Sequence, residues 1–176
     1  GDKDMKLIVF SDSHHANITD MLSIIDEEKP DAVLHLGDLT ADVDDIRCVF
    51  PELHVYNVRG NNDWNVENVK DSLVVHAGPA NIFLTHGHLY GVRRNTLALE
   101  AAARRNGCNV ALYGHTHEAE ITRKKDMLIA NPGSISMPYS SAPPSYLRLN
   151  IRKDQVEPEL VYLERQKSYT HWFGSI

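Results

Sequence analysis

The first half of the chain alternates between two hydrophobic patterns. Short apolar runs rich in β-forming residues predict strands over 6–10, 32–36 and 54–58. Apolar residues at helical spacing predict amphipathic helices over 17–28 and 43–50. Strands that alternate with helices form parallel sheets in which each helix crosses from one strand to the next. The first half therefore predicts a parallel arrangement.

The second half is dominated by pairs of strands, which are predicted at 73–76 with 81–85, 119–122 with 127–130 and 145–151 with 156–163. An alanine-rich helix is predicted over 96–106, with Gly107 as its C-terminal cap, ahead of an apolar run that begins at Val110. Pro158 predicts that the last strand lies at a sheet edge or contains a bulge. Hairpins imply antiparallel pairing, so the fold class predicted is α/β with a mixed sheet, or two sheets packed face to face with helices outside.

Length and composition are those of one globular domain. The chain has 176 residues, of which 42% are hydrophobic and 24% charged, and it shows no internal repeat or linker. A single domain is therefore predicted over 5–165. Residues 1–4 precede a plausible start at Met5 and are interpreted as a remnant of cloning, and 166–176 as a C-terminal tail.

The net charge and the length of the apolar runs indicate which kinds of binding partner and which cellular location to expect. A net charge of -6 argues against broad binding to nucleic acid or to anionic membranes. No apolar run approaches the roughly 18 residues of a transmembrane helix, and no signal peptide is recognisable, so a cytoplasmic location is expected. Cys48 and Cys108 lie far apart and are predicted to be buried free thiols in a reducing compartment.

The candidate chemistry lies where the strands end. His115 and His117 follow the apolar run 110–114, and in extended backbone two such side chains face the same point. Four other strands end in residues of the same chemical kind. In α/β sheets, ligands bind beyond the carboxyl ends of the strands. The candidate metal ligands are therefore Asp12, His14, Asp38, Asn61, His86, His115 and His117.

This set combines two carboxylates, four imidazoles and one amide. Such a mixture suits Mn, Fe, Zn or Ni rather than calcium, which prefers oxygen ligands. Seven ligands are too many for one tetrahedral ion, whereas they suit two ions that share a bridging carboxylate. A structural zinc site would be closed and tetrahedral, and a chance cluster would have to explain five strand ends at once. The sequence therefore predicts a two-metal site.

The motifs that carry these residues resemble those of the calcineurin-like metallophosphoesterases. In order they are Asp12-x-His14, Gly37-Asp38, Gly60-Asn61-x-Asp63, His86-Gly-His88 and Gly114-His115-Thr-His117. The match runs from about residue 5 to 163 and is most similar to the small bacterial and archaeal phosphodiesterase branch, which is related to the retromer subunit VPS29. The resemblance implies a four-layer αββα sandwich. It also implies one ion on Asp12, His14 and His117, another on Asn61, His86 and His115, and Asp38 between them.

The resemblance implies a metal-dependent phosphoric ester hydrolase. Two ions roughly 3.5–4 Å apart can clamp a phosphoryl group and supply a bridging hydroxide for in-line attack. The leading expectation is a phosphodiesterase with two divalent ions, Mn first and Ni, Fe or Zn as alternatives. A phosphomonoesterase or nucleotide phosphatase on the same site is the nearest alternative. A VPS29-like protein-binding scaffold is the alternative from another class, and it is disfavoured because all seven ligand positions are filled by competent residues.

The residues predicted to act in catalysis are Asp38, Asn61, Asn62, Asp63 and His88. Many family members have a histidine where this chain has Asn62, which cannot donate a titratable proton. We therefore expect fast hydrolysis only of esters with acidic leaving groups, unless His88 or His15 supplies the proton. Asp63 is predicted to orient the loops behind the ligands. Three guanidinium groups are candidates for binding phosphate, those of Arg59, Arg93 and Arg94. For Arg93 and Arg94, a solvated position on the surface is the alternative.

The expected partner is a small phosphate ester. A nucleotide is possible, while a nucleic acid and a membrane are not expected, and a homodimer is left open. Loops near Asn62, near Tyr90 and over 132–145 are expected to contact the organic part of the substrate, but they carry no recognisable code.

Overall fold

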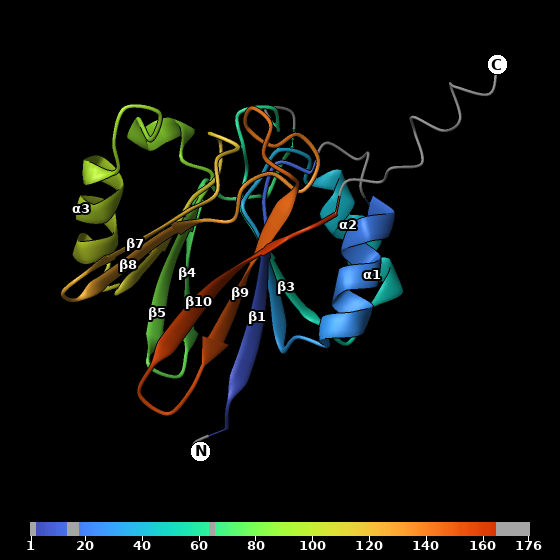
Figure 1. Ribbon diagram of the computed structural model, residues 1–176, viewed down its shortest axis with the longest axis horizontal. Helices are drawn as coiled ribbons and strands as arrows, with labels where there is room; N and C mark the ends of the chain where they lie inside the picture. The colour runs from blue at the N-terminus through green and yellow to red at the C-terminus, as the bar shows by residue number, and fades with distance from the viewer. Residues whose placement is uncertain (1–2, 14–17, 64–65, 165–176) are drawn as a thin grey trace.

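A computed structural model describes residues 3–13, 18–63 and 66–164, and it contains two five-stranded sheets (Figure 1). One sheet has the order β10-β9-β1-β2-β3 and the other the order β4-β5-β6-β8-β7. The strands of the first sheet are β1 (Met5–Phe10), β2 (Ala32–His35), β3 (His54–Asn57), β9 (Ser145–Ile151) and β10 (Val156–Tyr162). Those of the second are β4 (Ser72–Ala77), β5 (Ala80–Thr85), β6 (Val110–Leu112), β7 (Glu120–Lys124) and β8 (Met127–Asn131).

Three helices cover the outer faces of the sheets. Figure 1 shows α1 (Ile18–Glu28) and α2 (Ala41–Val49) on one side of the molecule and α3 (Leu97–Arg105) on the other. The alternation of side chains along β1 explains this layering, because successive residues of a strand point to opposite faces. Leu7 and Val9 belong to the core between the sheets, whereas Ile8 and Phe10 pack in the cluster under α1 and α2. The predicted four-layer α/β sandwich is confirmed.

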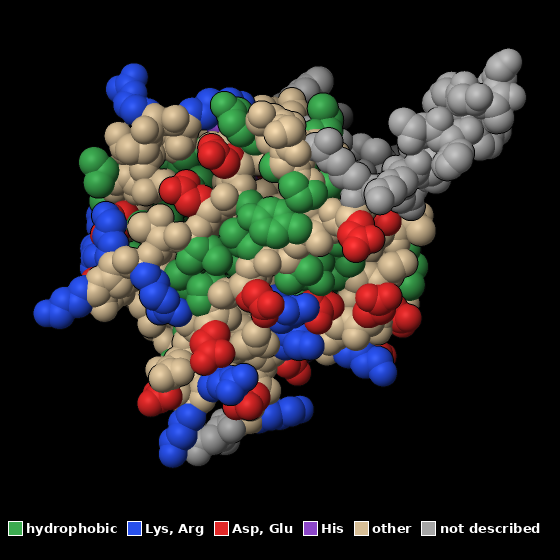
Figure 2. Space-filling model, in the orientation of Figure 1, with side chains coloured by type: hydrophobic (Ala, Val, Ile, Leu, Met, Phe, Trp, Pro, Cys, Tyr) green, Lys and Arg blue, Asp and Glu red, His purple; other side chains and the backbone are tan. Residues whose placement is uncertain are grey.

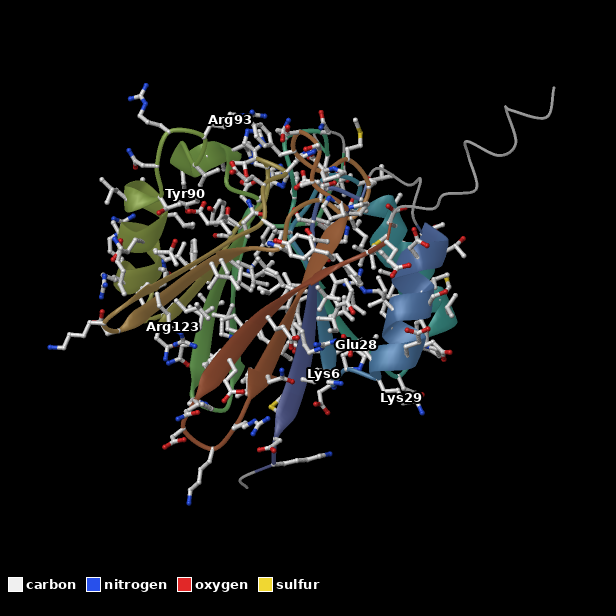
Figure 3. The ribbon with its side chains drawn as sticks, viewed as in Figure 1. Lys6, Glu28, Lys29, Tyr90, Arg93 and Arg123 are labelled. Carbon is white, nitrogen blue, oxygen red and sulfur yellow. The ribbon has the colours of Figure 1, made fainter. Side chains whose placement is uncertain are left out.

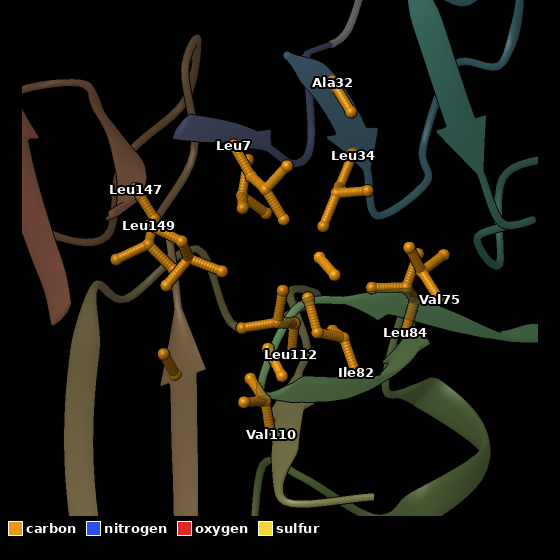
Figure 4. Packing of buried hydrophobic residues seen from close by; sticks show 14 of the residues in the cluster. Leu7, Ala32, Leu34, Val75, Ile82, Leu84, Val110, Leu112, Leu147 and Leu149 are labelled. Atoms are coloured by element: carbon orange, nitrogen blue, oxygen red, sulfur yellow. The ribbon is translucent and has the colours of Figure 1, made fainter. Parts of the chain in front are cut away.

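The core between the sheets is built from aliphatic side chains. In Figure 4, Leu7, Leu34 and Leu147 face Ile82 and Leu112 of the opposite sheet. All five are at most 1% exposed. Truncating one such leucine to alanine typically costs about 2–5 kcal/mol of stability, so this layer holds the two sheets, and the loops at their ends, in a fixed relation.

The pairing of the strands agrees with the parallel arrangement predicted for the first half and with the hairpins predicted for the second. β1, β2 and β3 are parallel, as predicted. The predicted hairpins β4–β5, β7–β8 and β9–β10 are antiparallel. β6, for which the sequence predicted no partner, pairs in parallel with both β5 and β8, so this sheet is mixed. The reason is that the hairpin after β6 joins the sheet through its second strand, β8, which runs in the same direction as β6.

Local features confirm several smaller predictions. Pro158 lies in β10, an edge strand, where it removes no hydrogen bond from the sheet interior. Gly107 has a φ of 70° and follows the C-cap of α3, where the Cys108 N–H donates to the carbonyl of Ala103. Cys108 is a buried free thiol, but Cys48 is exposed, so its predicted burial is wrong. It lies on the solvent side of a helix whose inward positions are filled by other residues.

The surface around the edge strand β10 is partly hydrophobic. Figure 2 shows hydrophobic side chains gathered across the middle of the face that β10 crosses, with charged side chains around them. Tyr162, at the end of β10, is 51% exposed. Within the described residues, no helix has the length and apolar character that crossing a membrane would require.

Candidate metal centre

Asp12 lies at the centre of the polar cluster, directly after β1, and is fully buried. Its Oδ2 accepts hydrogen bonds from the Ser11 hydroxyl (2.7 Å) and from the His115 backbone N–H (3.1 Å). In the described part of the chain, its Oδ1 has no hydrogen-bond partner. Two imidazole nitrogens lie near this atom, Nε2 of His117 at 3.3 Å and Nε2 of His86 at 3.7 Å. A buried carboxylate oxygen without a donor is costly, and a cation is the group that these surroundings suit.

Asp38, which follows β2, supplies the second buried carboxylate. Its two oxygens accept from the backbone N–H of Asn62 (3.0 Å) and from the side-chain amide of Asn62 (2.8 Å). Its Oδ2 lies 3.6 Å from Nε2 of His86. One ligand atom each of Asp12, Asp38 and His86 lies within 4.8 Å of the others. These three buried side chains therefore form the innermost part of a candidate metal site.

The tautomers of two histidines are fixed by backbone carbonyls. Nδ1 of His86 donates to the carbonyl of Leu36 (2.8 Å), and Nδ1 of His117 donates to the carbonyl of Met137. In the neutral imidazole, Nε2 then carries a lone pair. That lone pair faces Asn61 Oδ1 at 3.0 Å in one case and Asp12 Oδ1 at 3.3 Å in the other. Acceptors that face each other across such short distances suit a shared cation.

His115 connects the cluster to the surface. Its Nδ1 lies 3.1 Å from Asn61 Oδ1, the same oxygen that approaches His86. Its Nε2 accepts a hydrogen bond from Nε of Arg93 (3.1 Å). Asn61 and Arg93 are exposed, whereas His86 is fully buried. The Asn61 amide and the His115 ring, with Arg93 beyond it, thus form the solvent side of the site.

The electrostatics of the cluster follow from this burial. Burial raises the pKa of Asp12, but the adjacent His117, His86 and Ser11 outweigh it and leave that pKa below its usual value. The contact with Asp12 raises the pKa of His117. Burial, with contributions from His86 and Arg93, lowers the pKa of His115 to about 4. Because metal ligation requires the neutral imidazole, His115 has the charge that ligation needs at neutral pH. While its Nε2 accepts from Arg93, the ring proton is on Nδ1, so ligation through Nδ1 requires the other tautomer.

The backbone is strained at the candidate ligands. Asp12, Asp38, His115 and His117 have φ values of 55°, 60°, 70° and 62°. Non-glycine residues in this region each cost on the order of 1–3 kcal/mol, and such residues cluster at functional sites. Close approach also constrains Gly60, because a Cβ there would lie 2.2 Å from Asp38 Oδ1. The loops are shaped to bring ligand atoms together rather than to minimise local energy.

Asp63 ties together the loops that follow β2 and β3. This residue is buried, and its carboxylate accepts four backbone N–H groups at 2.9–3.0 Å. The donors are Asp38, Leu39, Thr40 and Gly60. Asp63 thus fixes the backbone of Asp38 and of the turn that carries Asn61, which is the geometry expected of an orienting carboxylate.

A second polar network, which the sequence did not reveal, supports the loops from behind. The Gly37 N–H donates to Nδ1 of His35 (3.2 Å), so Nε2 of His35 donates to the Ser13 hydroxyl (3.0 Å). Ser13 in turn donates to Asp42 in α2 (2.6 Å). His35 has the pattern of an ordinary strand residue, and its partners are contributed by the ends of two other elements. No periodicity or motif identifies such a contact.

The structure brings six of the seven predicted ligands together. They are Asp12, Asp38, Asn61, His86, His115 and His117. His14 and His15 lie outside the described residues. His88 borders the cluster, with its ring centroid 5.5 Å from that of His86, and its Nδ1 is buried without a partner in the described chain. Arg59 is paired with Asp71 (3.1 Å), and among the contacts of the described residues Arg93 is the predicted guanidinium group that reaches the cluster.

A four-layer α/β sandwich with carboxylates, imidazoles and an amide at one rim defines a metal-dependent hydrolase class. The model of the calcineurin-like phosphoesterase superfamily domain matches residues 5–154. The chain belongs to this family. Metal dependence is thus a family property, and the donor set described above suits it.

Curated relatives carry corresponding names. The probable metallophosphoesterase YsnB of Bacillus subtilis is 32% identical over 154 residues, which cover 85% of this chain and 86% of that protein. Phosphodiesterase MJ0936 of Methanocaldococcus jannaschii is 32% identical over 149 residues, which cover 73% of this chain and 83% of that protein. These relatives support hydrolysis of phosphate esters.

Solved structures show the same fold. A predicted phosphoesterase from Streptococcus pneumoniae has a TM-score of 0.78 and 29% identity, with 92% of this chain and 91% of that chain covered. Vps29 of Entamoeba histolytica, solved with zinc, has a TM-score of 0.74 and 24% identity, with 90% and 99% covered. The second likeness concerns the fold alone. The predicted relation to the phosphoesterases is confirmed, and for Vps29 the predicted likeness is confirmed for the fold.

Proposed function

We propose that this protein is a phosphodiesterase that works with two divalent cations. The observation that carries the proposal is the convergence of unshared acceptors around Asp12 Oδ1, a buried oxygen with no hydrogen-bond partner in the described chain. One ion would be held by Asp12 and His117, with His14 as a further expected ligand. The other would be held by Asn61, His86 and His115, and Asp38 would lie between them. When bound, such ions supply Lewis-acid charge neutralisation and a hydroxide nucleophile near neutral pH.

The protein's own groups have distinct tasks in this proposal. The carbonyls of Leu36 and Met137 keep the Nε2 lone pairs of His86 and His117 directed into the cluster. Asp63 holds the loop of Asp38 by its backbone. Asn62 donates to Asp38 and borders the site, so it can also donate a hydrogen bond to a phosphoryl oxygen, but not a proton to a leaving alkoxide. We therefore assign esters with acidic leaving groups as the preferred substrates.

Diester cleavage is favoured over monoester cleavage by the similarity to the phosphodiesterase MJ0936 and by the two cavities that flank the site. One cavity lies beside His117 and the other beside Arg93, with volumes of about 350 and 460 Å³. A diester has two organic substituents to place, whereas a monoester has one. We propose manganese as the first metal to test, and a cytoplasmic location. A scaffold function would not require this complete donor set.

The test is hydrolysis of paired aryl phosphate monoesters and diesters by metal-stripped protein, titrated with Mn, Ni, Zn and Mg. Asp38→Asn is the loss-of-function variant, and Asp44→Asn, at an exposed position of α2, is the matched control. We expect metal-dependent turnover of the diester that Asp38→Asn abolishes and Asp44→Asn leaves intact. Absence of turnover with every metal, in protein that binds two ions, would overturn the proposal and favour the scaffold.

A further inference from the structure

A polar cavity adjoins the candidate metal centre on the side of His115. Its volume is about 460 Å³, and its lining includes Arg93, Arg94, Asn95, Thr116, Glu118 and Tyr139. These residues come from the segment between the 3₁₀ turn η1 (His88–Tyr90) and α3, and from the loops after β6 and β8. Figure 3 shows Arg93 at the end of the molecule where the loops of the site gather. We call this space the arginine cavity.

The arginine cavity is separated from the cluster by one imidazole ring. Arg93 lines the cavity and donates from Nε to Nε2 of His115 (3.1 Å), while Nδ1 of His115 faces Asn61 on the opposite edge of the ring. A phosphoryl group seated at the cluster would therefore direct one of its substituents into this cavity.

In the described part of the chain, some charged side chains of the cavity already have hydrogen-bond partners, and others do not. Glu120 accepts a hydrogen bond from the Tyr113 hydroxyl (3.2 Å). Within the residues that the structure describes, the guanidinium of Arg94 and the carboxylate of Glu118 form no hydrogen bond or ion pair. Although the chain has a net charge of -6, two guanidinium groups line the cavity beside the candidate metal centre. Guanidinium binds carboxylate and phosphate through paired N–H donors.

We propose that the arginine cavity binds a negatively charged, hydroxyl-bearing substituent of the phosphate ester. Arg93 and Arg94 bind its anionic group, and Glu118 accepts from its hydroxyl. This assignment rests on the proposed function, because it takes the phosphoryl group to lie at the metal centre. It makes Arg94 a specificity residue rather than a catalytic one.

The test compares four phosphate monoesters as ligands of the manganese-loaded protein by calorimetry. They are 3-phosphoglycerate (anionic with a hydroxyl), glycerol 3-phosphate (neutral hydroxyls), phosphocholine (cationic) and phenyl phosphate (apolar). We expect 3-phosphoglycerate to bind ~10-fold more tightly than phenyl phosphate or phosphocholine, as one charge-assisted hydrogen-bond pair allows. Arg94→Gln is expected to remove this preference and to leave phenyl phosphate binding within ~2-fold.

Two variants sharpen the test. Arg105→Gln makes the same charge change at an exposed position of α3 and should leave all four affinities unchanged. Glu118→Gln keeps an acceptor oxygen for the hydroxyl but removes the negative charge, so it should strengthen binding of 3-phosphoglycerate and weaken that of phosphocholine. Equal affinities for all four ligands, or a preference for phosphocholine, would overturn the assignment.

Binding and turnover separate this inference from the proposed function. If Arg94-dependent binding is found but no diester is hydrolysed, the proposed activity fails and the cavity assignment stands. If diesters are hydrolysed while Arg94→Gln changes no ligand preference, the activity stands and the cavity assignment fails.

Discussion

The two sides of the candidate metal centre differ in how deeply their residues are buried. Asp12, Asp38 and His86 are at most 3% exposed, and backbone or hydroxyl groups fix each of them. Asn61 is exposed, and His115 is only half-buried. The inner side therefore has its geometry determined by folding, whereas the outer side can adjust to a ligand. A rigid carboxylate pair behind an adaptable amide and imidazole would let the same fold fix a cation on one side and adjust to a ligand on the other.

The largest expected effect concerns the rigid side. Asp63→Ala removes the acceptor of four buried backbone N–H groups and should cost about 3–5 kcal/mol in the free energy of unfolding, because each unsatisfied buried donor is expensive. Urea unfolding measures this cost, and a manganese titration measures its consequence for the site. We expect metal affinity to fall by about 10–100-fold, as for other groups that orient ligands.

A core variant provides the comparison. Leu149→Ala, in β9, should lower the free energy of unfolding by a similar amount, about 2–5 kcal/mol, because Leu149 is fully buried between the sheets. Its metal affinity should stay that of the wild type. If both variants lose stability and affinity in proportion, Asp63 supports the fold in general and does not orient the rigid side.

Metal loading should stabilise the fold by a smaller amount. A ligand that binds only the native state adds about 2.7 kcal/mol when its free concentration is 100 times its dissociation constant. We expect manganese to raise the unfolding midpoint of the wild type and of Asp44→Asn, and a chelator to reverse the rise. In Asp38→Asn the midpoint should respond weakly, because the residue between the two donor groups has lost its charge. An equal response of that variant would place the bound ions elsewhere.

Much of this comparison could be predicted from the sequence. Apolar runs that stop at Gly or Ser located the ends of β1, β2 and β6, and the residues just beyond them are those that converge. The continuous apolar run 6–10 predicted the strand, whose alternation then places Leu7 and Val9 on one face and Ile8 and Phe10 on the other. Local patterns reach this far because both strand ends and side-chain alternation are properties of a few neighbouring residues.

The rest depends on contacts between distant segments. The hydroxyls of Ser134 and Ser136 donate to the carbonyl of Asp12 at 2.9 and 2.8 Å, across more than 120 residues of chain. The contact between Arg93 and His115 and the parallel pairing of β6 with β8 are of the same kind. A surface arginine and one that reaches a ligand have the same local sequence, so only the tertiary arrangement distinguishes them.

The adaptable side should make the metal-free protein sensitive to mild acid. Burial lowers the pKa of His115 to about 4, from an ordinary value of 6.5. The unfolded chain therefore binds a proton that the folded chain does not between these pH values. The stability from neutral His115 is complete above about pH 6.5 and is lost as the pH falls toward about 4. Contact with Asp12 raises the pKa of His117 and gives the opposite trend.

Urea unfolding of chelated protein at several pH values between 7 and 4.5 measures this dependence. His115→Gln should flatten the decline in that range, because glutamine does not titrate. His54→Gln, at an exposed position of β3, is the matched control and should leave the decline unchanged. An unchanged slope in His115→Gln would show that another group, such as His88, whose pKa burial also lowers, dominates the acid sensitivity.

The smallest expected effect tests where the adaptable side meets the leaving group. Asn62→His replaces the amide that donates to Asp38 Oδ2 at 2.8 Å with a group that can carry a titratable proton. Aryl diesters with a graded series of leaving-group pKa values measure the result. We expect ~10-fold faster hydrolysis of esters with basic leaving groups, at the low end of general acid catalysis, and little change for p-nitrophenyl esters. A uniform rise across the series would mean that the histidine acts on the phosphoryl group or on Asp38 instead. In that case the missing proton donor is not what limits this site, and His88, on its border, becomes the residue to substitute.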